Sequence, residues 1–426
     1  MRNLFSILLL TPLALACVQV GHAKPMADTK PSPTVAATRP VSLAELDRLV
    51  ALNNRALVAA QRATQSAQAG QDMAAARPNP TVSLNTSGYR ISRPTGTGSL
   101  DSIVRIDQPF ERGNKRDLRI AVSDALVSAS RLDEADVLRQ VRLFARQSFF
   151  DLKAAEEVAR LAADSATLAQ QTLSKAELRQ RAGDLSASEV ARIRTDSLKA
   201  QADAVQASVD LQRARLQLAQ LLAQESMAPQ LVTQGPWPAM TALPADQDWN
   251  IERRSDIQAA LRRVAATEKA VELANALQTR DVTVGAQLER DQTERGNLVG
   301  LGVSIPLFTG YDYRGEIRKA WVDRDLARDE LERVRATAMA EVAQNRFEVE
   351  RLCARAQQLQ DFALPSARQA FAAVQLAFTH GAASALDVIE ARRSLYSTET
   401  DTAKALADAA KARAAWAAAL ELQDMP

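Results

Sequence analysis

The sequence predicts a mainly α-helical protein with a small transmembrane β-barrel, built from a duplicated helix–strand–strand–long helix–helix unit. Three observations lead to this fold class: an internal repeat of about 200 residues, long segments without Gly or Pro, and segments of about ten residues in which apolar and polar residues alternate. A repeat of that length corresponds to a whole domain, so it indicates an internal duplication rather than a solenoid of short repeats.

The repeat is recognised by three pairs of landmarks. Gly310 follows Gly113 by 197 residues, and each comes after an apolar segment that contains a Pro. Gly381 follows Gly183 by 198 residues, and the stretch that begins at Asp256 follows the one at Ala56 by 200. Landmarks in one order and at nearly one offset predict a first repeat at 41–227, a linker at 228–250 and a second repeat at 251–426.

Each repeat changes its periodicity twice. The first opens with a helical pattern over 41–77, continues with strands at about 81–90 and 100–109, and then has a long helix over about 114–182. At 1.5 Å per residue this helix is ~100 Å long. A turn at 183–188 leads into a return helix that ends at about residue 224. The opening and return helices, placed in series, match the length of the long one.

The second repeat follows the same plan. Its strands are expected at about 281–290 and 298–307, its long helix at about 316–380 and its turn at 381–386, before a return helix to about residue 421. Pro365 should kink the long helix, because proline lacks the N–H that an interior helical position needs.

The first residues predict export. Arg2 precedes an apolar run from Leu4 to Ala16, and the small residues around Ala23 suit a peptidase, so residues 1–23 are predicted to be a signal peptide. An alternative is a lipoprotein signal with Cys17 as the acylated residue. Residues 24–40 contain four Pro and predict a flexible linker. Cleavage leaves Cys353 as the one cysteine, so no internal disulfide is expected.

Composition excludes several classes of function. The chain has 426 residues and a formal net charge of +2, whereas a nucleic-acid-binding protein needs an excess of basic residues to reach phosphates. With two His and two Cys we expect no metal site and no cofactor. The sequence also lacks a Gly-rich phosphate loop and a Ser/His/Asp set, so we expect no enzymatic activity.

The strands predict an assembly. A ten-residue strand with one apolar face fits an outer-membrane span, and spanning strands must close into a barrel because lipid offers no hydrogen bonds. Four strands are too few to close, whereas three chains supply twelve, continued by twelve helices as a tube. Residues at the strand ends are expected to form the barrel–helix junction (Pro109, Gly113, Pro306, Gly310) and an aromatic girdle at the membrane interface (Phe110, Phe308, Tyr311, Tyr313). The alternative for these aromatics is a local packing cluster.

The turn sequences carry a family resemblance. Residues 181–190 (RAGDLSASEV) and 380–388 (HGAASALDV) resemble the periplasmic tips of the outer-membrane efflux protein family, the TolC-like outer membrane factors. The resemblance covers nearly the whole mature chain. It implies a homotrimer in the Gram-negative outer membrane, with a 12-stranded β-barrel and a 12-helix periplasmic α-barrel, surrounded by outer-membrane lipid. It also implies docking onto a periplasmic adaptor and an inner-membrane pump of the RND type.

A finer resemblance concerns the substrate. Residues 76–80 (ARPNP) and 108–116 (QPFERGNKR) are similar to the CzcC-type branch that serves heavy-metal efflux, although Arg112 and Asn114 depart from its pattern. This implies export of heavy-metal cations; the alternative is a duct of the same fold for drugs or other small molecules. An alternative of a different class is a periplasmic adaptor or coiled-coil scaffold, but an adaptor needs one hairpin with flanking β-rich domains.

The tips contain the candidate gate. Glu189, Asp387 and Glu390 lie one to two turns after the tip glycines, and three-fold symmetry would arrange them as rings of carboxylates. Such rings attract cations, and their repulsion should raise the pKa values. The alternative is that these acids stabilise helix N-termini.

The same tips are expected to dock the adaptor. Four residues are predicted to be turn and cap residues of that surface: Gly183, Ser186, Gly381 and Ser384. The resemblance places an Arg two residues after the second tip glycine to hold the gate shut, but Ala383 stands there, so closure must be achieved differently.

Overall fold

The computed structural model describes residues 38–87, 101–240, 250–291 and 296–421. The chain divides into two units, Met1–Ala37 and Thr38–Pro426, and only the second is described here. The predicted signal peptide, the possible lipidation site Cys17 and most of the predicted linker at 24–40 lie outside the described residues.

The first repeat contains four α-helices and the first strands. They are β1 (Arg39–Val41), α1 (Leu43–Asn53), α2 (Arg55–Ala75), β2 (Thr81–Ser87), β3 (Asp101–Phe110), α3 (Lys115–Arg181) and α4 (Ala187–Leu221), followed by the 3-10 helix η1 (Glu225–Gln230) and β4 (Leu231–Thr233). The prediction of one continuous helix over 41–77 is wrong. Asn54 has an extended conformation, and its side chain accepts hydrogen bonds from the backbone N–H groups of Ala56 and Leu57. Asn54 therefore ends α1 and caps α2.

The second repeat follows the same order. Its elements are the 3-10 helix η2 (Ile251–Arg253), α5 (Ser255–Ala276), β5 (Val282–Asp291), β6 (Gly296–Ser304), α6 (Arg314–Gln358), the π-helix η3 (Leu359–Ala363), α7 (Leu364–Thr379) and α8 (Ala385–Ala419). Pro365 lies in the first turn of α7, directly after the π-helix. The helix changes type at the position where the sequence predicts a kink, because a widened turn accommodates the missing N–H of the proline.

The strands form two sheets. β1 and β4 pair in parallel, and the larger sheet is antiparallel in the order β2-β3-β5-β6. Its register places Val82 opposite Ile106, Ile106 opposite Ala286, and Ala286 opposite Leu301. Directly opposed residues share a face, so most apolar positions of the four strands lie on one side, and Ile103 and Leu298 lie on the other. The apolar side is exposed to solvent in the single chain; its large exposed members are Val82, Leu84, Val104, Ile106, Phe110, Val284, Leu288, Val299, Leu301 and Val303.

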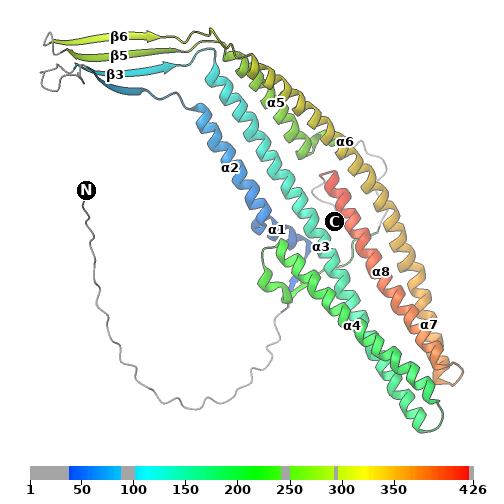
Figure 1. The fold of residues 1–426 in the computed structure, drawn as a ribbon. Coiled ribbons are helices and arrows are strands. Elements are labelled where there is room, and N and C mark those ends of the chain that lie inside the picture. Colours follow the sequence, from blue (N-terminus) through cyan, green and yellow to red (C-terminus); the bar gives the residue numbers. More distant parts are fainter. Residues whose placement is uncertain (1–37, 88–100, 241–249, 292–295, 422–426) are drawn as a thin grey trace, which may run out of the picture. The chain divides into compact units, whose positions relative to one another are not determined.

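The helices pack around α3. This helix contacts α2 and α4 of its own repeat and α5 and α8 of the other, while α6 contacts α5 and α8. Figure 1 shows α2 and α4 following each other along α3, and α5 and α8 doing the same between α3 and the α6–α7 pair. The short helices thus lie in series beside the long ones. Among the described residues, no helix is both long enough and apolar enough to cross a membrane.

The backbone repeats the duplication of the sequence. The left-handed conformation occurs at Asn114 (φ 57°) and again 199 residues later at Tyr313 (φ 64°), each directly before a long helix. It also occurs at Ala223 and, 198 residues later, at Glu421, both with φ 52°. Equivalent positions in the two repeats therefore adopt the same rare conformation, which is what an internal duplication produces.

The largest core cluster lies where α1, β1 and β4 cover the middle of α3 and the end of α4. Its buried members include Val41, Leu46, Phe149, Leu152 and Leu218. Elsewhere the helices contact one another through smaller clusters that contain many small residues, such as the alanines of α8 beside Val349 and Trp416. Small side chains allow close approach of helix axes, so helices can form a wall with little core beneath it.

Candidate functional site

The helical hairpins end in two turns of the same design. At the first, Gly183 has φ 85°, its N–H donates to Gln180 O over 3.0 Å, and Asp184 N–H donates to Arg179 O over 2.9 Å. At the second, Gly381 has φ 77°, and Ala382 N–H donates to Ala377 O over 2.8 Å. A left-handed residue with these bonds is the usual glycine end of a helix, so both glycines are required by the backbone.

Each return helix begins with a capping box. Glu189 N–H donates to Ser186 Oγ over 3.3 Å, and Glu189 Oε2 accepts from Ser186 N–H over 3.0 Å. Ser384 and Asp387 repeat the arrangement at 3.2 and 2.8 Å. The two acids therefore satisfy orphan N–H groups at helix N-termini, as in the alternative interpretation of these residues.

The hydrogen bonds of the capping boxes shift the pKa values of Glu189 and Asp387 in the single chain. The hydroxyl and backbone N–H of Ser186 lower the pKa of Glu189, and the N–H and hydroxyl of Ser384 lower the pKa of Asp387. In the single chain hydrogen bonds thus favour the charged form of both acids, whereas repulsion within a three-fold ring is a property of the assembly and stays a prediction. Glu390 lies one turn beyond Asp387 and is exposed.

Beyond the tips, a buried ion cluster joins the two repeats. Arg392 Nη2 of α8 donates to Asp196 Oδ2 of α4 over 2.6 Å, and Arg393 Nε donates to Asp196 Oδ1 over 2.8 Å. Arg392 also donates to Ser165 Oγ of α3. The side chains of Asp196 and Arg392 are 6% and 8% exposed. One hairpin is thus fastened to the other by the buried pair Asp196–Arg392, to which the exposed Arg393 adds a second contact.

Sequence reasoning missed this cluster, although the repeat carried a signal. At the offset of 198, Thr195 corresponds to Arg393 and Asp196 to Ser394. At these two positions the first repeat has an acid, Asp196, and the second has a base, Arg393. Opposite charges at neighbouring positions of the two repeats are compatible with a contact between the repeats. Nearer the tips, Leu173 and Ile193 of the first repeat pack with Ile389 of the second.

The short helices meet end to end at two joints. In the first repeat, Asn54 Nδ2 donates to Leu221 O over 2.9 Å, so α2 follows α4 directly. In the second, Arg254 Nη1 donates to Ala419 O over 3.0 Å, and Glu421 accepts from the N–H of Ser255, so α5 follows α8. Arg254 is 2% exposed and also pairs with Asp256 and Glu341.

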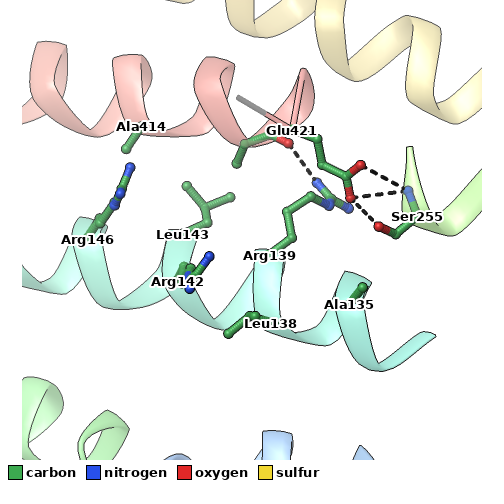
Figure 2. Close-up of a pocket in the computed structure, with 10 residues that line it drawn as sticks. Ala135, Leu138, Arg139, Arg142, Leu143, Arg146, Ser255, Ala414 and Glu421 are labelled. Atoms are coloured by element: carbon green, nitrogen blue, oxygen red, sulfur yellow. Dashed lines mark hydrogen bonds between the residues drawn. The ribbon is translucent and has the colours of Figure 1, made fainter. Parts of the chain in front are cut away.

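A cavity of about 210 Å³ adjoins the second joint. Figure 2 shows Arg139, Arg142 and Arg146 of α3 along one wall, with Ser255 and Glu421 at one end. Arg139 pairs with Asp136 and Arg146 with Asp47, which neutralises two of the three guanidinium groups.

The predicted barrel–helix junctions are not equivalent. Gly113 has φ 75°, and a Cβ at this residue would lie 2.8 Å from the Cβ of Thr279, so both backbone and space demand glycine. A Cβ at Gly310 would meet nothing within 4 Å, and the left-handed residue of this repeat is Tyr313. Gly310 and Gly113 are landmarks of the sequence repeat, but they do not have the same backbone conformation.

The prolines of the two junctions also differ in their surroundings. Pro109 lies within β3, opposite Thr283 of β5, whereas Pro306 follows the end of β6. Lys115 Nζ, at the start of α3, donates to Thr279 O over 2.7 Å and to Asp281 Oδ1 over 2.8 Å. The junction between β3 and α3 of the first repeat is thus fastened to the second repeat.

The predicted interface aromatics divide into two groups. Phe308 and Tyr313 form an edge-on pair with centroids 5.2 Å apart, and Tyr311 lies 5.7 Å from Tyr313. These three form a local packing cluster, which was the alternative interpretation. Phe110 instead occupies the last position of β3 on the apolar side of the sheet and is 53% exposed.

Within the described ranges, no cluster of three or more His, Cys, Asp or Glu residues is arranged to hold a metal ion. His380 ends α7 as its C-cap residue, and Cys353 is buried among the residues of α6 and α8. Burial raises the pKa of the Cys353 thiol.

Comparison with known proteins gives consistent matches over the whole helical region. The model of the family described as "Outer membrane efflux protein" matches residues 48–224 and 250–420. The chain is 29% identical to the cobalt-zinc-cadmium resistance protein CzcC of Cupriavidus metallidurans, over 93% of this chain and 94% of that protein. It is 27% identical to the pyoverdine export outer membrane protein OpmQ of Pseudomonas putida, over 84% and 82% of the two chains. The solved structure of the outer-membrane channel OprN shares the fold, with a TM-score of 0.75, 22% identity and coverage of 89% of both chains.

Proposed function

Because the chain belongs to the outer membrane efflux protein family, and is therefore an outer-membrane channel component rather than an enzyme, we propose that three copies form one continuous duct. Twelve strands, four from each copy, form the barrel in the outer membrane. Twelve helical segments continue it as a tunnel through the periplasm. The tips at Gly183 and Gly381 face a periplasmic adaptor, which connects the duct to an inner-membrane pump of the RND type.

The sheet is the observation that carries this proposal. Its apolar side exposes Leu301 by 85% and Val299 by 80%, far more than a water-soluble sheet tolerates on a large patch. β2 and β6 each have a partner on one side only among the described strands. An apolar face with two open edges is stable in lipid only if neighbouring copies complete the hydrogen bonding.

The outer face of α4 supports the same assembly. Leu198, Val205, Val209 and Leu216 are exposed and follow one another at spacings of 7, 4 and 7 residues. Apolar residues at that spacing form the seam of a coiled coil. In the proposed trimer, this seam packs against a long helix of the next copy.

Heavy-metal cations are the proposed cargo. The similarity to a relative named for cobalt, zinc and cadmium resistance, over nearly the full length of both chains, supports this choice. The similarity to a relative named for pyoverdine export keeps another small-molecule cargo as the alternative. Substrate choice belongs to the pump in either case, and the duct supplies a wide polar passage.

The proposed gate consists of the rings of Glu189, Asp387 and Glu390 at the narrow end. The buried cluster around Asp196 lies on the same hairpins, within about two helical turns of these acids. Because Ala383 replaces the gate arginine that the family resemblance implies, we assign closure to Asp196, Arg392 and Arg393. They hold the second hairpin against the first and so keep the tip narrow.

A pair of arginine substitutions tests the membrane-spanning sheet. Leu301→Arg places a charge on the apolar face, at a cost of about 2–4 kcal/mol near the middle of a bilayer, whereas Gln287→Arg places it on the polar face. We expect Leu301→Arg to abolish heat-modifiable trimer in the outer-membrane fraction and Gln287→Arg to preserve it. If the parent chain were recovered in the soluble periplasmic fraction, the adaptor or scaffold interpretation would replace the channel.

The cargo is tested in a host that lacks its own outer-membrane efflux channels but expresses the cognate pump and adaptor. We expect the chain to lower the accumulation of zinc, cobalt and cadmium and to raise tolerance to them. Lowered accumulation of an organic siderophore or drug, with unchanged metal content, would instead support the alternative cargo.

A further inference from the structure

The polar side of the four-stranded sheet contains a feature that the channel proposal does not explain. Three of its positions are glycines, Gly285 on β5 and Gly300 and Gly302 on β6, which we call the glycine track. Gly285 lies opposite both Asp107 of β3 and Gly302, and Gly300 lies opposite Gln287. Glycine in a strand interior weakens the strand, so its presence indicates that something approaches the backbone closely.

The groups that approach are long side chains of the neighbouring strands. A Cβ at Gly285 would lie 2.1 Å from Asp107 Oδ1 and 3.0 Å from Arg105 Nη2. A Cβ at Gly302 would lie 3.5 Å from Arg105 Nη2. The guanidinium of Arg105 therefore extends from β3 across β5 to β6, and lies along the sheet rather than away from it.

Asp107 holds the arginine in this position. Arg105 Nε donates to Asp107 Oδ1 and Oδ2 over 2.9 and 2.8 Å, and the two side chains are 34% and 22% exposed. Gln287 behaves similarly, because a Cβ at Gly300 would lie 2.9 Å from its Cγ. The glycine track thus makes room for the Arg105–Asp107 ion pair and for the side chain of Gln287, which lie against the sheet.

We propose that the Arg105–Asp107 pair on the glycine track sets the ion selectivity and the open width of the barrel lumen. The inference rests on the proposed trimeric channel, in which the polar side of the sheet faces the passage. Three copies then contribute a ring of three neutral ion pairs that lie flat against the wall. A ring of unpaired charges at the same level would select ions by sign, whereas paired charges do not.

Glu289 contributes to the ion selectivity that the unsubstituted channel should have. It lies on the same side of the sheet, one row of opposed residues beyond Arg105, and Asp101 lies on that side one row farther, so acids outnumber bases near the pair. The parent channel should therefore prefer cations weakly. Neutralising Asp107 decreases that negative excess, and neutralising Arg105 increases it.

Reversal potentials in planar bilayers under a KCl gradient test the assignment. We expect Asp107→Asn to shift the permeability ratio toward anions, Arg105→Gln to shift it toward cations, and the double variant to return close to the parent. Each shift should be larger at about 0.1 M salt than at about 1 M, because the Debye length falls from about 10 to about 3 Å. A purely structural role for the pair would move both single variants in the same direction, and that result or the absence of any shift would overturn the inference.

A glycine substitution tests the width. Gly285→Ala removes the space that Asp107 occupies, so the pair should be displaced into the lumen and single-channel conductance should fall. Gly296→Ala at the start of β6 is the control, because a Cβ there meets nothing within 4 Å. Equal conductance of the two variants would contradict the proposed width. If Gly285→Ala fails to assemble, the variants Asp107→Asn and Arg105→Gln still decide the selectivity. If the parent chain conducts no ions at all, the channel proposal itself fails.

Discussion

Arg392 of α8 and Asp196 of α4 form a 2.6 Å ion pair that fastens the hairpin of the second repeat to that of the first. Burial of both partners makes the pair a poor source of stability, since desolvation offsets much of the attraction. The pair contributes to the specificity of the structure rather than to its stability. A buried charge tolerates few alternative partners, so the pair specifies how the two hairpins lie against each other.

Removing the acid should loosen this contact. Asp196→Asn leaves Arg392 and Arg393 without a countercharge, and breaking a buried pair from one side costs about 3–5 kcal/mol. We expect faster amide hydrogen exchange in the first turns of α8 and a larger single-channel conductance. The matched control is Asp210→Asn on the same helix, whose pair with Arg213 is exposed and contributes about 0–1 kcal/mol. Equal exchange in the two variants would refute the assignment of closure to Asp196.

The capping boxes predict a dependence of tip order on pH. Because hydrogen bonds from Ser186 and Ser384 lower the pKa values of Glu189 and Asp387 in the folded chain, their stabilisation is complete above the unfolded values. It is lost as the pH falls through the lower folded values, so the tips should stay ordered from neutral pH to about pH 5 and loosen below about pH 4. A spin label at Ala182→Cys, in a Cys353→Ala background, measures this order.

A variant with weakened boxes controls that experiment. Ser186→Ala with Ser384→Ala removes both hydroxyl groups, at about 1 kcal/mol each, but keeps the backbone N–H groups that donate to the two carboxylates, so it should weaken the acid transition. A transition of the assembled trimer above about pH 5 would contradict the account, because it would mean that repulsion between the carboxylates outweighs their capping bonds.

The acidic rings predict block by divalent cations. Asp387→Ala with Glu390→Ala removes six carboxylates from the proposed trimer, two from each of three copies. We expect larger currents in planar bilayers and weaker block by magnesium or calcium, since the ring no longer concentrates cations at the entrance. Asp401→Ala, an exposed acid farther along α8, serves as the control. Unchanged currents would remove Asp387 and Glu390 from the gate.

The joint between α8 and α5 predicts a stability difference between two adjacent arginines. Arg254→Ala removes the bond to Ala419 O and leaves Asp256 and Glu341 without their buried partner, which should cost about 3–5 kcal/mol. Arg253 is exposed, and Arg253→Ala should change stability by less than about 0.5 kcal/mol. Thermal unfolding in detergent compares the two, and similar melting temperatures would show that the joint does not depend on Arg254.

The order of elements was predictable because it depends on local patterns. Two-residue alternation identified the strands around Val104 and Val284, and segments without Gly or Pro identified the long helices. The break at Asn54 was missed because helical periodicity continues across it. Asparagine is a preferred helix cap, however, and it is held here by a contact with Leu221, 167 residues away, that no local pattern reveals.

The turns and helix caps of the candidate site were predictable from the sequence, whereas the contacts of its charged residues were not. Gly183 and Gly381 predicted the turns. The spacing of Ser186 and Glu189 is that of a capping box, which gives Glu189 a local role at the start of its helix. The contact between Asp196 and Arg392 depends on tertiary packing between repeats. Similarly, the left-handed conformation of Tyr313 was not predictable from the landmark Gly310, because the equivalent left-handed residues Asn114 and Tyr313 are 199 residues apart, two more than Gly113 and Gly310.

The mass of the purified protein in detergent is the most direct test of the central claim, that the chain completes its barrel only with other copies of itself. Native mass spectrometry should give three times the mass of the mature chain, with dissociation only on heating. A stable monomer, in detergent or in water without it, would contradict the account, because one copy cannot pair both open edges of its four-stranded sheet.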